Sequence, residues 1–445
     1  MLRDRSTSHE TGCAVDEGVV IAAGVLLLGW SVLAGRLTRA DLSGPILFVV
    51  AGLVLANGAW APLDVAIDNS SAHLLAEATL ALLLFADASR VDLRRLRQDA
   101  GLPLRLLLIG LPLAFAAGSA VALGLLLDLP WQLGALIGAA LAPTDAALSA
   151  AVVADEQVPR RVRRALNVES GLNDGLAAPV VTFLIAAAAV HLGTADEAES
   201  VAAKVPDALA ELGLGVALGV AIGWIGGRLI DLGTTRGWTT PGGNRIAAIT
   251  LPVLALAGGA AIGANVFIAA FVAGLAFGAT CHANADEEVA ELPELMGEIL
   301  SLVVWMLFGA SLLLPGLEDV DWRVVVVAVA SLTVVRMVPV ALALVGAGVD
   351  RATTVFLGWF GPRGLASVVF LLLAAEGLPE DDPGVRTVVA TITLTVLLSV
   401  VAHGVSARPL SGWLARRCGE EAGGDMPGEP PRMPRMHHLA DPDDD

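Results

Sequence analysis

Apolar runs of about twenty residues recur along almost the whole chain, and this feature most limits how the chain can fold. A helix of about 20 residues, rising ~1.5 Å per residue, just crosses a hydrocarbon core ~30 Å thick. With only 16% charged residues, a soluble protein of 445 residues could not cover its surface. The runs are continuous rather than alternating, which argues against an outer-membrane barrel. The sequence therefore predicts an all-α polytopic membrane protein.

We predict about thirteen spans, with residues 1–17 as an N-terminal tail, 18–410 as the transmembrane domain and 411–445 as a cytoplasmic, largely disordered tail. The first run follows two acids and is expected to be a retained helix, not a signal peptide. Only Gly258-Gly259 separates spans eight and nine, which could also form one long bent helix. The predicted spans cover residues 18–36, 44–60, 72–89, 103–127, 131–154, 165–190, 208–230, 246–258, 260–280, 298–315, 322–348, 353–376 and 386–407.

Arginines alternate from loop to loop, which sets the expected direction of the chain. They follow spans 1, 3, 5 and 7, whereas the loops between those spans carry few basic residues. The positive-inside rule then puts the amino end outside and the carboxyl end in the cytoplasm of a plasma-membrane protein. The acidic 281–298 loop falls inside by parity and fits the rule worst. The net charge of −18 arises mostly from solvated loop and tail acids, and we expect no nucleic-acid partner.

The stretch NVESGLNDG, residues 167–175, places acids and amides inside an apolar span. Asp174 lies ten residues beyond Arg164, or ~15 Å of helix, which is half the depth of the hydrocarbon core. Asp145 lies ten residues before Asp155 and reaches a similar depth from the same side. Ionisable groups at that depth are functional candidates by default. The alternative for both acids is a structural helix–helix hydrogen bond.

Helical spacing divides the same stretch into two neighbouring stripes. Glu169 and Asn173 share one stripe, and Ser170 and Asp174 share the next. One stripe can therefore support the structure while its neighbour presents oxygen ligands.

Two spans carry helix-breaking residues at mid-depth. In LAPTDAALS, Pro143 lacks an N–H and frees carbonyl groups beside Thr144 and Asp145. In GWFGPRGLAS, glycines and a proline surround Arg363. Interrupted helices at matching positions, here spans 5 and 12, are typical of inverted-repeat secondary transporters. Arg363 has two interpretations, since it could neutralise the exposed helix ends or contact substrate.

Two further charges lie in predicted spans. Arg336 is fourteen residues from both Trp322 and Asp350, near mid-membrane, and needs an acid partner. Glu169 is the best-placed acid, and a structural ion pair is favoured over a direct role in transport. Asp87, in LLFADASRVD, lies near the cytoplasmic end of span 3 and could be an ion ligand or a helix cap.

At these residues the chain resembles NhaP-type sodium/proton antiporters of the cation:proton antiporter superfamily, over most of residues 18–410. NVESGLNDG is similar to the family's E-S-x-x-N-D segment, APTD to its T-D, and GPRG to its G-x-R-G. The resemblance implies thirteen spans, a homodimer and the electroneutral exchange of one cation for one proton, with no cofactor and no enzymatic activity. The residues implied to line the Na⁺ site are Asp174, Asp145, Thr144 and Ser170.

The same resemblance assigns supporting roles. Asn173 is implied to be held by the Glu169–Arg336 pair. Asp87 matches a family acid that is often glutamate in an L-F-E-G-G-like stretch, but here the acid is displaced by one residue or shortened by one methylene. Its role as a ligand therefore departs from the family pattern.

The residues themselves suggest a mechanism that needs one carboxylate. A buried Asp174 can hold either a proton or a dehydrated cation on the same oxygens, so that the two compete. Hard oxygen ligands suit alkali cations such as Na⁺ or Li⁺. A K⁺/H⁺ antiporter uses the same architecture. A cation channel would share the intramembrane acids, and an intramembrane aspartyl protease would need two catalytic aspartates, although N-D-G is unlike a G-x-G-D stretch.

Overall fold

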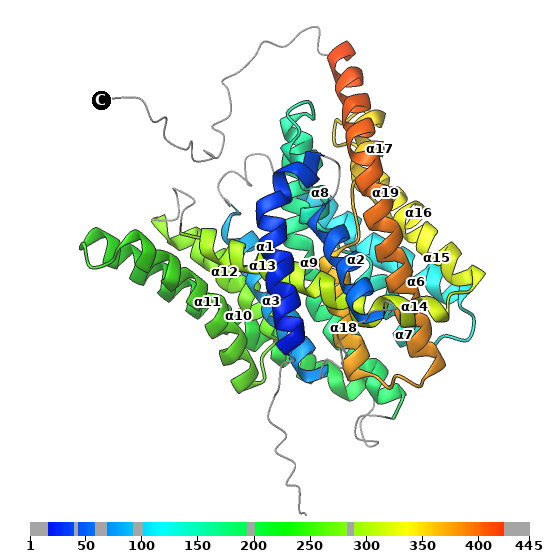
Figure 1. Cartoon of the computed structure of the whole chain (residues 1–445), viewed down its shortest axis with the longest axis horizontal. Helices are drawn as coiled ribbons and strands as arrows, with labels where there is room; N and C mark the ends of the chain where they lie inside the picture. Colours follow the sequence, from blue (N-terminus) through cyan, green and yellow to red (C-terminus); the bar gives the residue numbers. More distant parts are fainter. Residues whose placement is uncertain are drawn as a thin grey trace, which may run out of the picture.

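The computed structural model describes residues 17–39, 43–57, 69–91, 101–193, 201–282 and 289–421, and these residues contain helices and no strand. The predicted tails at residues 1–16 and 422–445 lie outside the described residues. The predicted all-α class is therefore confirmed for the part of the chain that is described. Figure 1 shows the helices gathered into one elongated bundle, with α10–α12 on one flank and α15–α17 and α19 on the other.

A helix occupies each predicted span. The unbroken helices are α1 (Glu17–Arg39), α2 (Gly44–Asn57), α3 (Asn69–Ser89), α9 (Arg160–His191), α10 (Val201–Thr235), α11 (Pro241–Ile262), α12 (Val266–Thr280) and α19 (Pro383–Glu421). Among the described helices, eight stretches are long and apolar enough to cross a membrane, and others are shorter apolar helices. The count of thirteen crossings stays a prediction.

The other spans are built from shorter pieces, of which the two labelled η are π-helical turns. They are α5 (Gly101–Arg105) with η1 (Leu106–Gly110) and α6 (Leu111–Leu125); α7 (Trp131–Ala140) with α8 (Ala146–Ala154); α13 (Glu291–Leu307) with η3 (Phe308–Leu312) and α14 (Leu313–Glu318); α15 (Trp322–Leu332) with α16 (Val334–Ala343); and α17 (Arg351–Trp359) with α18 (Leu365–Gly377).

The predicted split between spans eight and nine is in the wrong place. α11 continues through Gly258 and Gly259, which cost a helix only about 1 kcal/mol each relative to alanine. The helix ends at Gly263, whose φ of +67° favours glycine. Asn265 then caps α12 by accepting the Ile268 N–H at 3.0 Å. Conformation and capping, not glycine content, set the break.

The two predicted interruptions are confirmed. α7 ends before Pro143 and α8 begins after Asp145, while α17 ends before Gly361 and α18 begins after Gly364. The backbones meet at the breaks, because the Asp145 N–H donates to the Pro362 carbonyl at 2.8 Å. Non-helical backbone at this depth is tolerated only inside protein or beside a water-filled cavity.

A third break interrupts the span that carries Arg336, at a point the sequence did not signal. Thr333 has φ −116° and ψ −94°, which separates α15 from α16. The surrounding SLTVV stretch has neither glycine nor proline. The Ser331 carbonyl, which lies at this break, accepts a hydrogen bond from Arg363 Nη2 at 3.4 Å.

The flank formed by α10 and α12 is packed through a seam of small residues. Gly215, Gly219 and Gly223 recur every four residues on α10, and a Cβ at any of them would press against the backbone of residues 265–273. Glycine at such spacing lets two membrane helices approach closely. By contrast, the apolar window of α1 is 0% buried within the chain.

Candidate ion site

Thr144 lies at the centre of the polar cluster and joins the first interruption to α9. Its hydroxyl lies 3.1 Å from the Ser170 hydroxyl and accepts a hydrogen bond from Asn173 Nδ2 at 2.7 Å. All three side chains are buried. The structure thus brings together Thr144, Ser170 and Asn173, from both stripes of the predicted cluster.

Asp145 caps two helices at once. Its Oδ1 accepts the Leu148 N–H of α8 at 2.9 Å, and its Oδ2 accepts the Leu365 N–H of α18 at 2.6 Å. Both bonds neutralise the positive N-terminal ends of α8 and α18. These half-helices start where the two interruptions, residues 141–145 and 360–364, meet, a place called the crossing below. The carboxylate predicted as an ion ligand is therefore already engaged by backbone donors. It joins the two interrupted helices through one side chain.

Glu169 and Arg336 form the predicted pair. Arg336 Nη1 lies 2.5 Å from Glu169 Oε1, and each side chain is only 1% exposed. Gly361 lies directly beneath the guanidinium, since a Cβ there would overlap Arg336 Nε. The pair therefore links α9 to α16 and lies against the second interruption.

Arg363 is fully buried and donates to freed backbone carbonyls. Its Nη1 lies 3.0 Å from the Gly361 carbonyl and 3.3 Å from that of Pro143. These are the oxygens that the two interruptions release. The contacts match the interpretation that Arg363 neutralises exposed helix ends.

Asp174 follows Ser170 by one turn on α9 and is partly buried. Its Oδ1 is buried and has no hydrogen-bond partner among the described residues. Asp145 and Asp87 both interact with it electrostatically. A buried polar atom without a partner needs an explanation, and a bound ion is one of the few available.

Asp87 lies on α3, on the side of the cluster that faces α9. A Cβ built on Gly171 would be 3.4 Å from Asp87 Cβ, so the acid packs against the turn that also carries Ser170 and Asp174. Although Asp87 is displaced by one residue from the family pattern, it still lies beside the polar cluster.

One implied contact is wrong. Asn173 donates to Thr144, and its Oδ1 has no hydrogen-bond partner among the described residues. It therefore does not join the Glu169–Arg336 pair by any hydrogen bond. The helical stripe aligned Asn173 with Glu169, but the unwound backbone at Thr144 presents a nearer acceptor.

Two serines form hydrogen bonds to the backbone at the crossing, and neither of them was predicted from the sequence. Ser367 Oγ donates to the Ala140 carbonyl at 2.7 Å, which satisfies the end of α7. Ser399 Oγ accepts the Arg363 N–H at 2.6 Å. Lone serines inside apolar spans carry no pattern, so only the three-dimensional arrangement reveals their roles.

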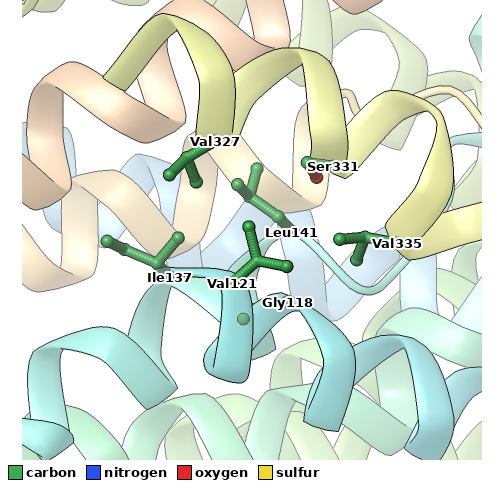
Figure 2. Close-up of a pocket in the computed structure, with 8 residues that line it drawn as sticks. Gly118, Val121, Ile137, Leu141, Val327, Ser331 and Val335 are labelled. Carbon is green, nitrogen blue, oxygen red and sulfur yellow. The ribbon is translucent and has the colours of Figure 1, made fainter. Parts of the chain in front are cut away.

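The described side chains do not form a conventional metal centre. No group of three or more His, Cys, Asp or Glu converges among them as a metal site would require. A small pocket lies nearby, between α6, α7, α15 and α16, and is lined by apolar side chains and Ser331 (Figure 2). It has room for about one water molecule.

A prediction follows from the close approach at Gly364. A Cβ there would overlap the Asp145 carboxylate, so Gly364→Ala should displace the crossing and cost about 1–3 kcal/mol of stability. Exchange activity should fall with it. Gly404→Ala in α19 is the control, because nothing lies within 4 Å of a Cβ at that position. Thermal unfolding in detergent compares the two, and equal unfolding temperatures would contradict the argument.

The sequence of the chain matches a known protein family. The sequence model described as "Sodium/hydrogen exchanger, transmembrane" matches residues 22–413. The chain belongs to the sodium/hydrogen exchanger family. The match covers nearly all of the described helices and agrees with the predicted resemblance.

Two relatives of the chain are named as antiporters. The K⁺/H⁺ antiporter NhaP2 of Shewanella sp. (strain MR-4) is 24% identical over 392 residues, which is 86% of this chain and 65% of the relative. A Na⁺/H⁺ antiporter of Schizosaccharomyces pombe is 26% identical over 314 residues, 62% of this chain and 64% of the relative. The chain thus spans about 65% of the length of these relatives.

A solved structure shares the fold. The sodium proton antiporter MjNhaP1 from Methanocaldococcus jannaschii, determined at pH 8, matches with a TM-score of 0.71 at 18% identity. The alignment covers 89% of this chain and 99% of that one. At this identity the likeness establishes the fold of the chain alone.

Proposed function

We propose that this chain exchanges a monovalent cation for H⁺ across a membrane through the carboxylate of Asp174. One observation carries the proposal: Asp174 has a buried oxygen without a hydrogen-bond partner, one turn from Ser170 and beside the crossing at Thr144. Such an oxygen can bind a proton or a dehydrated cation, and competition between the two couples their movements. Ser170, Thr144, Asp145 and Asp87 supply the surrounding oxygens.

Na⁺, and with it Li⁺, is our first assignment for the cation. The donors at the crossing are hydroxyl, amide and carboxylate oxygens, which suit alkali cations in general. Relatives are named for Na⁺ in fission yeast and for K⁺ in Shewanella, so K⁺/H⁺ exchange is the alternative within the same site.

Competing mechanisms are less compatible with the geometry. An aspartyl protease needs two aspartates free to activate water, whereas both oxygens of Asp145 accept backbone N–H groups. A channel would need no competition at one carboxylate.

The decisive measurement is dissipation of a pH gradient in vesicles on addition of Na⁺, Li⁺ and K⁺ in turn. Dissipation by none of them would contradict the proposal, and single-channel current steps would favour the channel.

We expect the exchange to be electroneutral. Asn173 lies next to Asp174 and contributes a dipole without a second titrating charge at that position. Cation-driven pH recovery in proteoliposomes should therefore be unchanged when the membrane potential is clamped with K⁺ and valinomycin, with Na⁺ as the tested cation. A protonophore control reports the residual electrical leak. Strong dependence on the clamped potential would mean unequal charge movement and contradict one-for-one exchange.

Orientation, membrane and assembly are proposals as well. We assign the protein to the plasma membrane, with the amino end outside and the carboxyl end in the cytoplasm. Two ion pairs support the side assigned to the acidic 281–298 segment: Arg90 pairs with Glu294, and Arg245 pairs with Glu291 at 3.0 Å. Glu291 and Glu294 thus lie at the same end of the bundle as the end of α3 and the start of α11.

A homodimer is supported by the surface of α1. This helix crosses the front of the bundle in Figure 1, and residues such as Val25 and Val32 are at least 65% exposed. Cross-linking of a Val32→Cys variant in native membranes would test whether two copies meet there.

A further inference from the structure

One charged contact at the edge of the bundle is not explained by the exchange mechanism. The guanidinium of Arg90, at the end of α3, faces the carboxylate of Glu294 in the first turn of α13 through two hydrogen bonds. The side chains are 45% and 27% exposed. An ion pair as exposed as this contributes about 0–1 kcal/mol to stability, so stability alone gives it little purpose.

The position of Arg90 relative to the ion site gives the pair another role. Arg90 directly follows α3, which ends at Ser89, and its N–H donates to the carbonyl of Asp87, in the last turn of that helix, at 3.3 Å. Asp87 in turn packs against Gly171 of α9, one turn from Asp174. Arg90 and Glu294 both interact electrostatically with Asp87.

A fixed positive charge one turn from the acids would oppose the entry of a cation. With Glu294 in place, the positive charge of Arg90 is balanced and its guanidinium is directed toward α13. Without Glu294, the same side chain could turn toward Asp87 and take the place of a cation. Glu298, one turn further along α13, adds negative charge near Asp87 and also interacts electrostatically with Arg90.

We propose that the Arg90–Glu294 pair sets the cation affinity of the site by balancing the Arg90 charge and directing its guanidinium toward α13. Arg90 and Glu294 are thus positioning residues that act through the acids of the ion site. The inference rests on the proposed exchange function and deepens it. It also gives a role to the acidic segment that fitted the charge rule worst.

The test measures KM and maximal rate for Na⁺, and in parallel for K⁺, from cation-driven pH recovery in proteoliposomes. Glu294→Gln should raise KM roughly 3- to 10-fold, the effect of an unbalanced charge at this range after partial screening by salt. Arg90→Gln should lower KM, because Glu294 then attracts cations. The double variant should return KM close to the wild-type value, and maximal rates should stay within about twofold.

The chain supplies a matched control on the same helix. Glu291 begins α13 and pairs with Arg245 of α11 rather than with Arg90, so Glu291→Gln should leave KM unchanged. Opposite shifts of KM in Glu294→Gln and Arg90→Gln would show that the pair acts through its charges. If the pair only held α3 against α13, its loss would raise KM in both variants. Unchanged KM in Glu294→Gln, equal effects of Glu291→Gln, or a raised KM in Arg90→Gln would each overturn the inference. Failure of the wild-type protein to exchange either cation would overturn the proposed function itself.

Discussion

Asp174→Asn should abolish cation/proton exchange while the protein still folds. Asparagine keeps the size of the side chain and removes both the exchangeable proton and the negative charge. The buried Oδ1 of Asp174 has no hydrogen-bond partner among the described residues, whereas both oxygens of Asp145 accept backbone N–H groups. Loss of the Asp174 carboxylate removes the group for which proton and cation are proposed to compete. Exchange in proteoliposomes should fall to the level of empty vesicles.

Two controls accompany that result. The thermal unfolding temperature of Asp174→Asn in detergent should match the wild type or exceed it, because a poorly solvated charge is removed. Asp207→Asn changes an exposed acid of α10 and should leave exchange unaffected. Transport by Asp174→Asn at the wild-type rate would contradict the assignment of Asp174 as the exchanging carboxylate.

Glu169→Gln should produce the largest loss of stability, about 3–5 kcal/mol. Arg336 is 1% exposed, so without Glu169 its charge would be left uncompensated inside the protein. Arg336 already has guanidinium nitrogens that lack hydrogen-bond partners among the described residues. The measurement is the yield of folded protein and its unfolding temperature in detergent.

The matched comparison uses an exposed pair and a double variant. Asp319→Asn breaks the contact of Asp319 with Arg386, whose side chains are 44% and 50% exposed, and should cost less than about 1 kcal/mol. Glu169→Leu combined with Arg336→Met should recover most of the stability lost in Glu169→Gln, since a buried pair replaced by apolar groups is often neutral. If Glu169→Gln and Asp319→Asn were equally mild, the pair would not be structural.

The sequence predicted features that local chemistry determines. Apolar length located the helices, and the prolines at 143 and 362 located the two interruptions. Counting residues from the arginine loops placed Asp174, Asp145 and Arg336 at similar depth. Charge balance then selected Glu169 as the partner of Arg336, because an unpaired charge at that depth is costly.

Features that depend on distant segments could not be predicted. The double cap by Asp145 requires the N–H of Leu365, 220 residues away, and no local pattern encodes it. The break at Thr333 occurs in a β-branched stretch without glycine or proline, so the fold around Arg363 and not the local sequence imposes it. Asn173 followed its helical stripe in the sequence but bonds Thr144 in the fold.

The double cap by Asp145 has a mechanical consequence. The Thr144 hydroxyl contacts Ser170 of α9, and Asp145 ties α8 to α18, so three helical pieces are joined through two adjacent residues, one turn from Asp174 on α9. α9 itself is an unbroken rod of 32 residues. Because α9 carries Asp174, any movement of its carboxylate beyond a side-chain rotation has to move α9 and the pieces bonded to it. If both faces reach that carboxylate in turn, the fastened pieces have to travel together as a single rigid body against the remaining helices.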